Sequence, residues 1–209
     1  MNCVIFDLDG TLLDTSPGIM ESVSFASKKL GYPQLTDNQL RTFIGPPLTD
    51  SFMRCYSCND EEAEKLTAAY REHYREGALL NAKPYDGIFE LCAELENCGC
   101  TLAVATSKPQ EFSKRILDYF GFTFSVICGA DMGGKLTKAD LIRECVTKTR
   151  ADYAFMIGDT EHDARGAMEA GVQFIAVSYG FGNPDEMSKY PHIGVADSPI
   201  DVLQIITEK

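Results

Sequence analysis

The 209-residue chain has no long apolar run and comparatively few basic residues. Its apolar runs fall well short of the ~18 residues that a membrane-spanning helix needs. Nineteen lysine and arginine residues stand against 31 aspartate and glutamate residues, so the formal net charge is −12. This charge argues against general binding to nucleic acids or to acidic membrane surfaces. It still allows a phosphorylated small molecule to bind, provided that a metal ion and a few cationic side chains gather at one place.

A secretory signal is not expected, because Asp7 and Asp9 interrupt the first apolar segment almost at once. We therefore expect a cytoplasmic protein whose eight cysteines are reduced, without a disulfide framework. The spacings C-x-x-C at 55–58 and C-x-C at 98–100 match a structural zinc site only incompletely. We interpret the cysteines mainly as small, buried or partly buried hydrophobic residues.

Short apolar runs alternate with helical patterns through most of the chain. The runs are continuous rather than alternating, which is typical of strands that are covered on both faces. Their β-α-β order predicts an α/β fold with a doubly wound parallel sheet. We expect strands at residues 3–7, 101–105, 124–128, 153–157 and 172–177, a weaker one near 193–196, and helices at about 86–98, 109–119, 137–148, 161–170 and 199–206.

Residues 15–83 break the alternation, because they contain no convincing strand. A capping-box pattern followed by apolar residues at helical spacing predicts a helix over 60–76. The sequence therefore predicts an all-helical subdomain at 15–83, inserted into an α/β core that consists of residues 1–14 and 84–209.

Polar side chains follow several of the expected strands. Asp7 ends the first strand and Asp9 follows it, Thr106 and Ser107 follow the second strand, and Asp159 follows the fourth. Ligands of open parallel sheets bind beyond the carboxyl ends of the strands. If the first strand lies between the second and the fourth, these side chains meet at one edge of the sheet.

Two more charged residues are expected at the same edge. Asp163 lies four residues after Asp159, and Lys138 stands at the start of the next expected helix. Lys135 is close enough to be a rival, but Lys138 is preferred because it opens the helix. Each residue alone has an ordinary explanation, such as a helix cap or a solvated charge. Their joint occurrence at compatible strand ends favours a functional site.

In this order the residues resemble the four-motif signature of the haloacid dehalogenase superfamily. The resemblance rests on Asp7-x-Asp9-Gly10-Thr11, on Thr106, on Lys138, and on Gly158-Asp159 with Asp163. One departure is Ala139, because the third motif of the superfamily often has proline after the lysine. The segments "DTSPGI" at 14–19, "IGPPL" at 44–48 and "PYDGI" at 84–88 resemble the phosphoglycolate phosphatase-like branch, whose insert is a helical cap on a Rossmann-like core.

The resemblance implies catalysis through an aspartyl-phosphate. Asp7 would be the nucleophile, because its attack on phosphorus gives a mixed anhydride that water cleaves readily. Asp9 would act as general acid towards the leaving oxygen and then as general base for water. The phosphate would be bound by the backbone at the Gly10 turn, by the hydroxyl groups at Thr106 and Ser107, and by Lys138.

The resemblance also implies Mg²⁺, a hard ion that prefers oxygen ligands. Asp7, the backbone carbonyl of Asp9 and Asp159 would bind the ion, with support from Asp163 through water. The helical cap would close over the site, exclude bulk water and contact the leaving group.

We expect hydrolysis of a small phosphate monoester, with phosphoglycolate as the first candidate by resemblance to the branch. Nucleoside monophosphates and pyrophosphate, as substrates of a 5'-nucleotidase or a pyrophosphatase, are close rivals. A β-phosphoglucomutase-like enzyme ranks lower, because "TSPGIMES" after Asp14 lacks the histidine that this branch usually carries. A dehalogenase ranks lower still, since its chemistry does not require Asp9 as proton donor.

The alternative from another class is a receiver-like protein in which Asp7 is phosphorylated and recognised by a partner. We expect a small phosphorylated metabolite as the ligand, neither nucleic acid nor membrane as a partner, and a monomer or homodimer.

Overall fold

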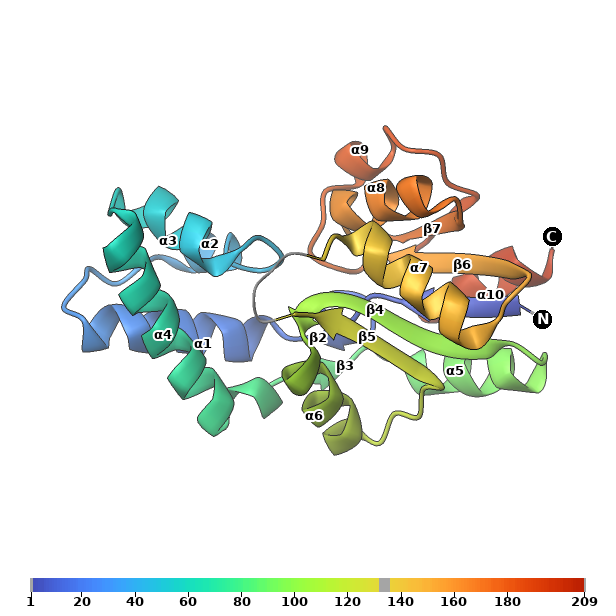
Figure 1. Cartoon of the computed structure of the whole chain (residues 1–209), viewed down its shortest axis with the longest axis horizontal. Coiled ribbons are helices and arrows are strands. Elements are labelled where there is room, and N and C mark those ends of the chain that lie inside the picture. Colours follow the sequence, from blue (N-terminus) through green and yellow to red (C-terminus); the bar gives the residue numbers. More distant parts are fainter. Residues whose placement is uncertain (1, 132–135, 209) are drawn as a thin grey trace. The chain divides into compact units, whose positions relative to one another are not determined.

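The structure is a computed structural model that describes residues 2–131 and 136–208. The chain divides into two compact units (Figure 1). One unit consists of residues 1–14 and 84–209 and contains the large sheet, and the other consists of residues 15–83 and is helical. A parallel α/β sheet with a helical insert near the N-terminus confirms the predicted fold class.

Six strands form the large sheet within the described part of the chain, and each neighbouring pair is parallel. Their order is β5-β4-β1-β6-β7-β8, so the first strand lies between the strands that the site requires as neighbours. The chain winds outwards from β1 on both sides, as in other doubly wound sheets. The strands are β1 (Asn2–Phe6), β4 (Thr101–Pro109), β5 (Val126–Ala130), β6 (Tyr153–Gly158), β7 (Gln173–Val177) and β8 (Gly194–Ala196).

The sheet is covered on both faces, which explains its continuous apolar strands. Cys3 and Ile5 of β1 belong to a buried cluster with residues of α7 and α8. Val4 and Phe6 alternate with them, point to the other face, and are equally buried. The helices of this unit are α5 (Ile88–Asn97), α6 (Gln110–Phe120), α7 (Lys138–Thr149), α8 (Glu161–Ala170), α9 (Pro184–Met187) and α10 (Pro199–Thr207).

One strand differs clearly from its predicted length. The strand expected at 101–105 continues as β4 to Pro109, because the chain still pairs with β5 after Thr106, with a shift of register before Pro109. The other predicted strands and helices of this unit end within two residues of the observed boundaries. The extended end of β4 matters for the site, because it changes which side chains point inward.

The helical unit packs around α4 (Asp60–Glu76), which contacts both α1 (Ser16–Lys29) and α3 (Leu48–Tyr56). A short α2 (Asp37–Arg41) packs against α1, and the single turn η1 (Ala78–Leu80) follows α4. The predicted helix over 60–76 is confirmed. The chain leaves the first unit through β2 (Leu13–Asp14) and returns through β3 (Lys83–Pro84), which form a separate two-stranded sheet.

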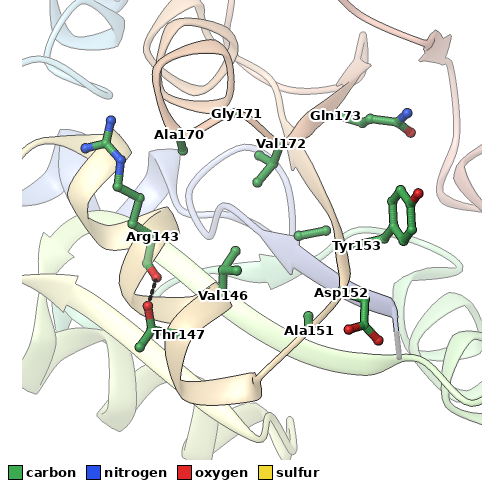
Figure 2. Close-up of a pocket in the computed structure, with 11 residues that line it drawn as sticks. Arg143, Val146, Thr147, Ala151, Asp152, Tyr153, Ala170, Gly171, Val172 and Gln173 are labelled. Atoms are coloured by element: carbon green, nitrogen blue, oxygen red, sulfur yellow. Dashed lines mark hydrogen bonds between the residues drawn. The ribbon is translucent and has the colours of Figure 1, made fainter.

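A surface groove of about 560 Å³ lies at the amino ends of β6 and β7 (Figure 2). Arg143 and Val146 of α7 line one side of it, and Tyr153 and Gln173 line the strand side. The predicted site lies at the other end of the same strands. In the described residues, no helix is both long and apolar enough to span a membrane, and all eight cysteines are unbridged.

Candidate active site

The ends of three neighbouring strands bring the predicted acidic residues together. Asp7 directly follows β1, and its backbone N–H donates to the carbonyl of Ile157 on β6 at 2.9 Å. The parallel pairing thus continues one residue beyond β1, which places Asp7 at the same edge as Asp159 after β6. Asp163 reaches this edge from the first turn of α8.

The described residues contain one group of three acidic or other metal-ligating side chains that could hold an ion: Asp7, Asp159 and Asp163. Each offers a carboxylate oxygen, and the three oxygens lie within 4.8 Å of one another. All three side chains are buried. Carboxylates so close together repel, and the loss of water on burial adds to the cost of their charge.

The pKa values express this cost. Burial is the main reason why the pKa of Asp7 rises to about 7, with Lys138 opposing the rise and Asp163 and Asp9 adding to it. Burial likewise raises the pKa of Asp159 to about 8, with further increases from Asp163 and Asp7. A divalent cation bound to the three oxygens would favour their charged forms and lower both pKa values.

Lys138 is the cation that joins two members of the cluster. Its Nζ lies 2.5 Å from Oδ1 of Asp7 and 2.7 Å from Oδ1 of Asp163. Burial lowers the pKa of Lys138, but the two carboxylates together raise it above its usual value. A side-chain Cβ at Gly166 of α8 would lie 2.7 Å from Cγ of Lys138, so the glycine leaves room for the lysine. Lys135, the rival for this position, lies outside the described residues.

The position of Lys138 is fixed by the hydrogen bonds that cap the start of its helix, α7. Thr137 and Asp140 form a capping box, in which the hydroxyl of Thr137 accepts from the backbone N–H of Asp140 at 3.2 Å. The carboxylate of Asp140 accepts in return from the backbone N–H of Thr137 at 3.0 Å. This reciprocal cap fixes the first turn of α7, in which Lys138 is the first residue.

The two carboxylate oxygens of Asp163 have different partners, one at the start of α8 and one on Lys138. Its Oδ2 accepts from the backbone N–H of Thr160 at 3.0 Å and from the Thr160 hydroxyl at 2.6 Å, which completes a capping box at the start of α8. Its Oδ1 faces Lys138. A Cβ at Gly158 would overlap Asp163, so glycine is required there for the carboxylate to approach β6.

Asp159 is held by one donor on each oxygen. The hydroxyl of Thr11 donates to Oδ1 at 3.0 Å, and the backbone N–H of Phe181 donates to Oδ2 at 2.8 Å. Gly10 has a φ of +88°, and a Cβ at this position would overlap the Asp159 carboxylate. Glycine therefore both permits the turn after β1 and opens the approach to Asp159.

Asp9 lies beside the cluster and has a cationic partner that sequence reasoning missed. Nζ of Lys108 lies 2.9 Å from Oδ1 of Asp9, and the Lys108 side chain is only 6% exposed. Side chains alternate along β4, so Thr106 and Lys108 are buried whereas Ser107 between them is exposed. The alternation of side chains along a strand would have predicted that Lys108 points to the same side as Thr106. That prediction needed the knowledge that β4 continues past residue 105.

The predicted phosphate-binding residues thus occupy different environments. Thr106 is buried, and its Oγ1 accepts from the backbone N–H of Lys108 at 3.2 Å, which leaves the hydroxyl proton for another acceptor. Gly10 and Lys138 lie at the acidic cluster, whereas Ser107 is on the exposed side of β4. The geometry therefore favours Lys108 over Ser107 as the neighbour of Thr106 in a polar site.

The donor set fits a hard metal ion. Three buried carboxylates offer oxygen ligands within a small space, and Mg²⁺, Ca²⁺ and Mn²⁺ prefer such ligands. A lysine that neutralises only part of the negative charge leaves a net attraction for a cation. This buried triad of aspartates can hold a metal ion.

Comparison with known proteins identifies the family. The family model of haloacid dehalogenase-like hydrolases matches residues 4–177. A 5'-nucleotidase of Pseudomonas aeruginosa is 42% identical over 189 residues, which cover 88% of this chain and 86% of that protein. A phosphoglycolate phosphatase of Aliivibrio fischeri is 30% identical over 198 residues, which cover 88% of this chain and 87% of that protein.

The fold is also shared with a solved structure. The crystal structure of a predicted phosphatase from Clostridium acetobutylicum superimposes with a TM-score of 0.90 at 38% identity, and the match covers 100% of this chain and 99% of that one. The family resemblance of the four motifs is thus confirmed, together with the predicted enzyme class: the chain belongs to the haloacid dehalogenase-like hydrolase family.

Proposed function

We propose that the protein is a Mg²⁺-dependent phosphatase that hydrolyses a small phosphate monoester through a phosphorylated Asp7. The observation that carries the proposal is the contact of Lys138 with both Asp7 and Asp163, inside a cluster that Asp159 completes. A phosphoryl group has dense negative charge, so its transfer depends on positioning and on nearby positive charge. Lys138 and Lys108 place two buried cationic side chains at this edge of the sheet, and a bound metal ion would add the rest of the positive charge.

Asp7 is the proposed nucleophile. Lys138 holds its Oδ1, and the other carboxylate oxygen, Oδ2, attacks phosphorus. The bond between Oδ2 and phosphorus forms while the bond between phosphorus and the leaving oxygen breaks, and Asp9 gives its proton to that oxygen. Asp9 then takes a proton from water, the water oxygen attacks phosphorus, and the bond between phosphorus and Asp7 breaks.

Other residues hold the reacting groups in place. Lys108 fixes the Asp9 carboxylate, while the hydroxyl of Thr106 and the ammonium group of Lys138 are the proposed ligands of the phosphoryl oxygens. Mg²⁺ would be held by the carboxylates of Asp7, Asp159 and Asp163 and by the backbone carbonyl of Asp9. When it is bound, the ion supplies positive charge that offsets the negative charge of the phosphoryl group. The insert of residues 15–83 is the proposed cap.

Two substrate classes come first for testing. The branch resemblance of the motifs favours phosphoglycolate, whereas the relative named as a 5'-nucleotidase has the higher identity, 42% against 30% for the phosphoglycolate phosphatase. Both substrates are small phosphate monoesters, and the core chemistry at Asp7 is the same for both. We therefore propose the monoester class, with nucleoside 5'-monophosphates and phosphoglycolate as the first members.

The test is release of inorganic phosphate from a panel of compounds, with Mg²⁺ or with EDTA. The panel contains nucleoside 5'-monophosphates, phosphoglycolate, pyrophosphate, a hexose 1-phosphate and an aryl phosphate. We expect turnover of at least one monoester with Mg²⁺, no turnover in EDTA, and recovery when Mg²⁺ is added back. Equal rates in EDTA and Mg²⁺ would contradict the metal requirement, and a stable phosphoprotein without phosphate release would favour the receiver-like alternative.

A further inference from the structure

The segment that follows β7 encloses Asp159, although no sequence motif pointed to it. It consists of Tyr179, Gly180, Phe181 and Gly182, and we call it the 179–182 segment. Its Phe181 backbone N–H donates to Oδ2 of Asp159 at 2.8 Å. A Cβ at Gly180 would overlap the side chain of Asp159, and one at Gly182 would overlap its carbonyl oxygen. The backbone of the segment is therefore packed directly against both parts of Asp159.

The same segment also supports the residue that holds the other oxygen of Asp159. The hydroxyl of Tyr179 donates to the backbone carbonyl of Thr11 at 3.3 Å. Thr11 is fully buried, and its own hydroxyl donates to Oδ1 of Asp159 at 3.0 Å. The Tyr179 ring is fixed in turn by the ring of Tyr85, with 4.8 Å between the ring centroids. One oxygen of Asp159 is thus held directly, and the other through Thr11.

The beginning of the segment is tied to the neighbouring strand. The backbone N–H of Ser178 donates to the carbonyl of Ala196 in β8 at 3.0 Å, and its hydroxyl donates to Oδ1 of Asp197 at 2.5 Å. The chain therefore enters the 179–182 segment from a fixed point. These two hydrogen bonds of Ser178 therefore help to hold the segment in contact with Asp159 and Thr11.

Two donors on opposite oxygens restrict rotation of a carboxylate. An ionised carboxylate has about four acceptor positions, so one donor on each oxygen leaves the others for a cation. Groups that orient a metal ligand in this way typically change metal affinity by about 10- to 100-fold when they are altered. A change in the orientation of Asp159 would alter the geometry of the whole triad, because its carboxylate oxygen lies within 4.8 Å of those of Asp7 and Asp163.

We propose that the 179–182 segment positions the Asp159 carboxylate and thereby sets the affinity of the site for its divalent cation. The inference rests on the proposed function in one respect, namely that the triad binds a divalent cation. Tyr179 and Gly180 are positioning residues, because they contact Asp159 and Thr11 and have no assigned contact with substrate.

The test is calorimetric titration of MgCl₂ into the full-length protein without substrate, with Mn²⁺ binding followed by electron paramagnetic resonance as a second probe. Gly180→Ala adds one methyl group that would overlap the Asp159 side chain and the backbone carbonyl oxygen of Gly10, at a position whose φ an alanine can adopt. We expect it to weaken Mg²⁺ binding by about tenfold or more. Gly77→Ala is the matched control, because a Cβ there meets no heavy atom within 4 Å, and its affinity should equal that of the unaltered protein.

A second variant decides the matter if Gly180→Ala does not fold, as judged by circular dichroism. Tyr179→Phe removes a single hydroxyl and adds no atom, and it should weaken Mg²⁺ binding roughly two- to tenfold. In phosphate-release assays, both folded variants should need more Mg²⁺ for half-maximal rate and recover most of the rate at saturating Mg²⁺. A merely structural defect would lower the maximal rate without shifting the Mg²⁺ midpoint.

The outcomes separate the inference from the proposed function. If the folded variants bind Mg²⁺ as tightly as the unaltered protein, the positioning role is overturned and the phosphatase proposal is untouched. If the unaltered protein binds neither Mg²⁺ nor Mn²⁺, the metal requirement of the proposed function fails, and the inference fails with it.

Discussion

The two ends of the central strands differ in the kind of polar groups that they gather. At the carboxyl end, Asp7, Asp159 and Asp163 are buried with carboxylate oxygens within 4.8 Å of one another, and the nearly buried side chain of Lys138 contacts two of them. At the amino end, a groove of about 560 Å³ is lined by partly buried apolar residues such as Val146 and Val172 and by exposed residues such as Tyr153, 69% of whose surface is accessible (Figure 2). The open groove therefore lies at one end, and the converging charges lie at the other.

The same two helices contribute to both ends, which explains the difference. Helices α7 and α8 begin at the acidic cluster and end beside the groove. Their amino ends present partial positive charge and capping side chains to the carboxylates. Near the groove, Arg143 of α7 pairs with Asp140 at 3.1 Å, but both side chains are about half exposed, and such pairs contribute only ~0–1 kcal/mol to stability. The burial and convergence of charged side chains therefore distinguish the end at which we propose that the reaction takes place.

The largest effect is expected from Asp7→Asn at the carboxyl end. The amide has nearly the shape of the carboxylate but cannot act as the nucleophile, so kcat/KM for phosphate release should fall by roughly 10⁴-fold or more. A thermal melt of the same variant controls for folding. Activity within tenfold of the unaltered enzyme, in a folded variant, would remove Asp7 from the nucleophile role.

A smaller effect is expected from Lys108→Met, which keeps the length of the side chain and removes its charge. Asp9 loses a charge-assisted contact at 2.9 Å. Such a contact is worth about 1.5–3 kcal/mol, which corresponds to a roughly 10- to 100-fold loss of kcat/KM. Lys108→Arg, which retains the charge, should lose less. If the methionine variant turned over substrate normally, the buried ion pair would have no part in the reaction.

The smallest effect is expected at the amino end, from Tyr153→Thr. The residue is exposed and lines the groove, and threonine retains the preference for a strand. Phosphate release should stay within about twofold, and stability should change by roughly 0.5 kcal/mol or less. A loss as large as that of Lys108→Met would show that the groove is coupled to the reaction, and the contrast between the two ends would no longer hold.

The sequence was most informative where apolar runs ended in charge. The uninterrupted strands indicated a sheet covered on both faces, and parallel topology then required Asp7 and Asp159 to meet at one edge. Lys138 was preferred because it opens an expected helix, and its contacts with Asp7 and Asp163 support that interpretation.

What the sequence did not reveal depended on backbone detail. Lys108 was missed because the strand was expected to stop at residue 105, so the alternation that buries Thr106 and Lys108 on one side was not applied. The 179–182 segment was missed for a different reason. It reaches Asp159 through a backbone N–H and through the space left by two glycines, and neither feature has a side-chain signature.

The most direct measurement of the central claim is the position of phosphate on the enzyme during turnover. Asp9→Asn should slow both steps by roughly 10²–10⁴, which gives time to quench the reaction in acid and map the modified peptide by mass spectrometry. We predict phosphate on Asp7, at a level that falls to zero when Asp7 is also replaced by asparagine. Phosphate on a different residue, or continued turnover without any phosphorylated enzyme, would contradict the account.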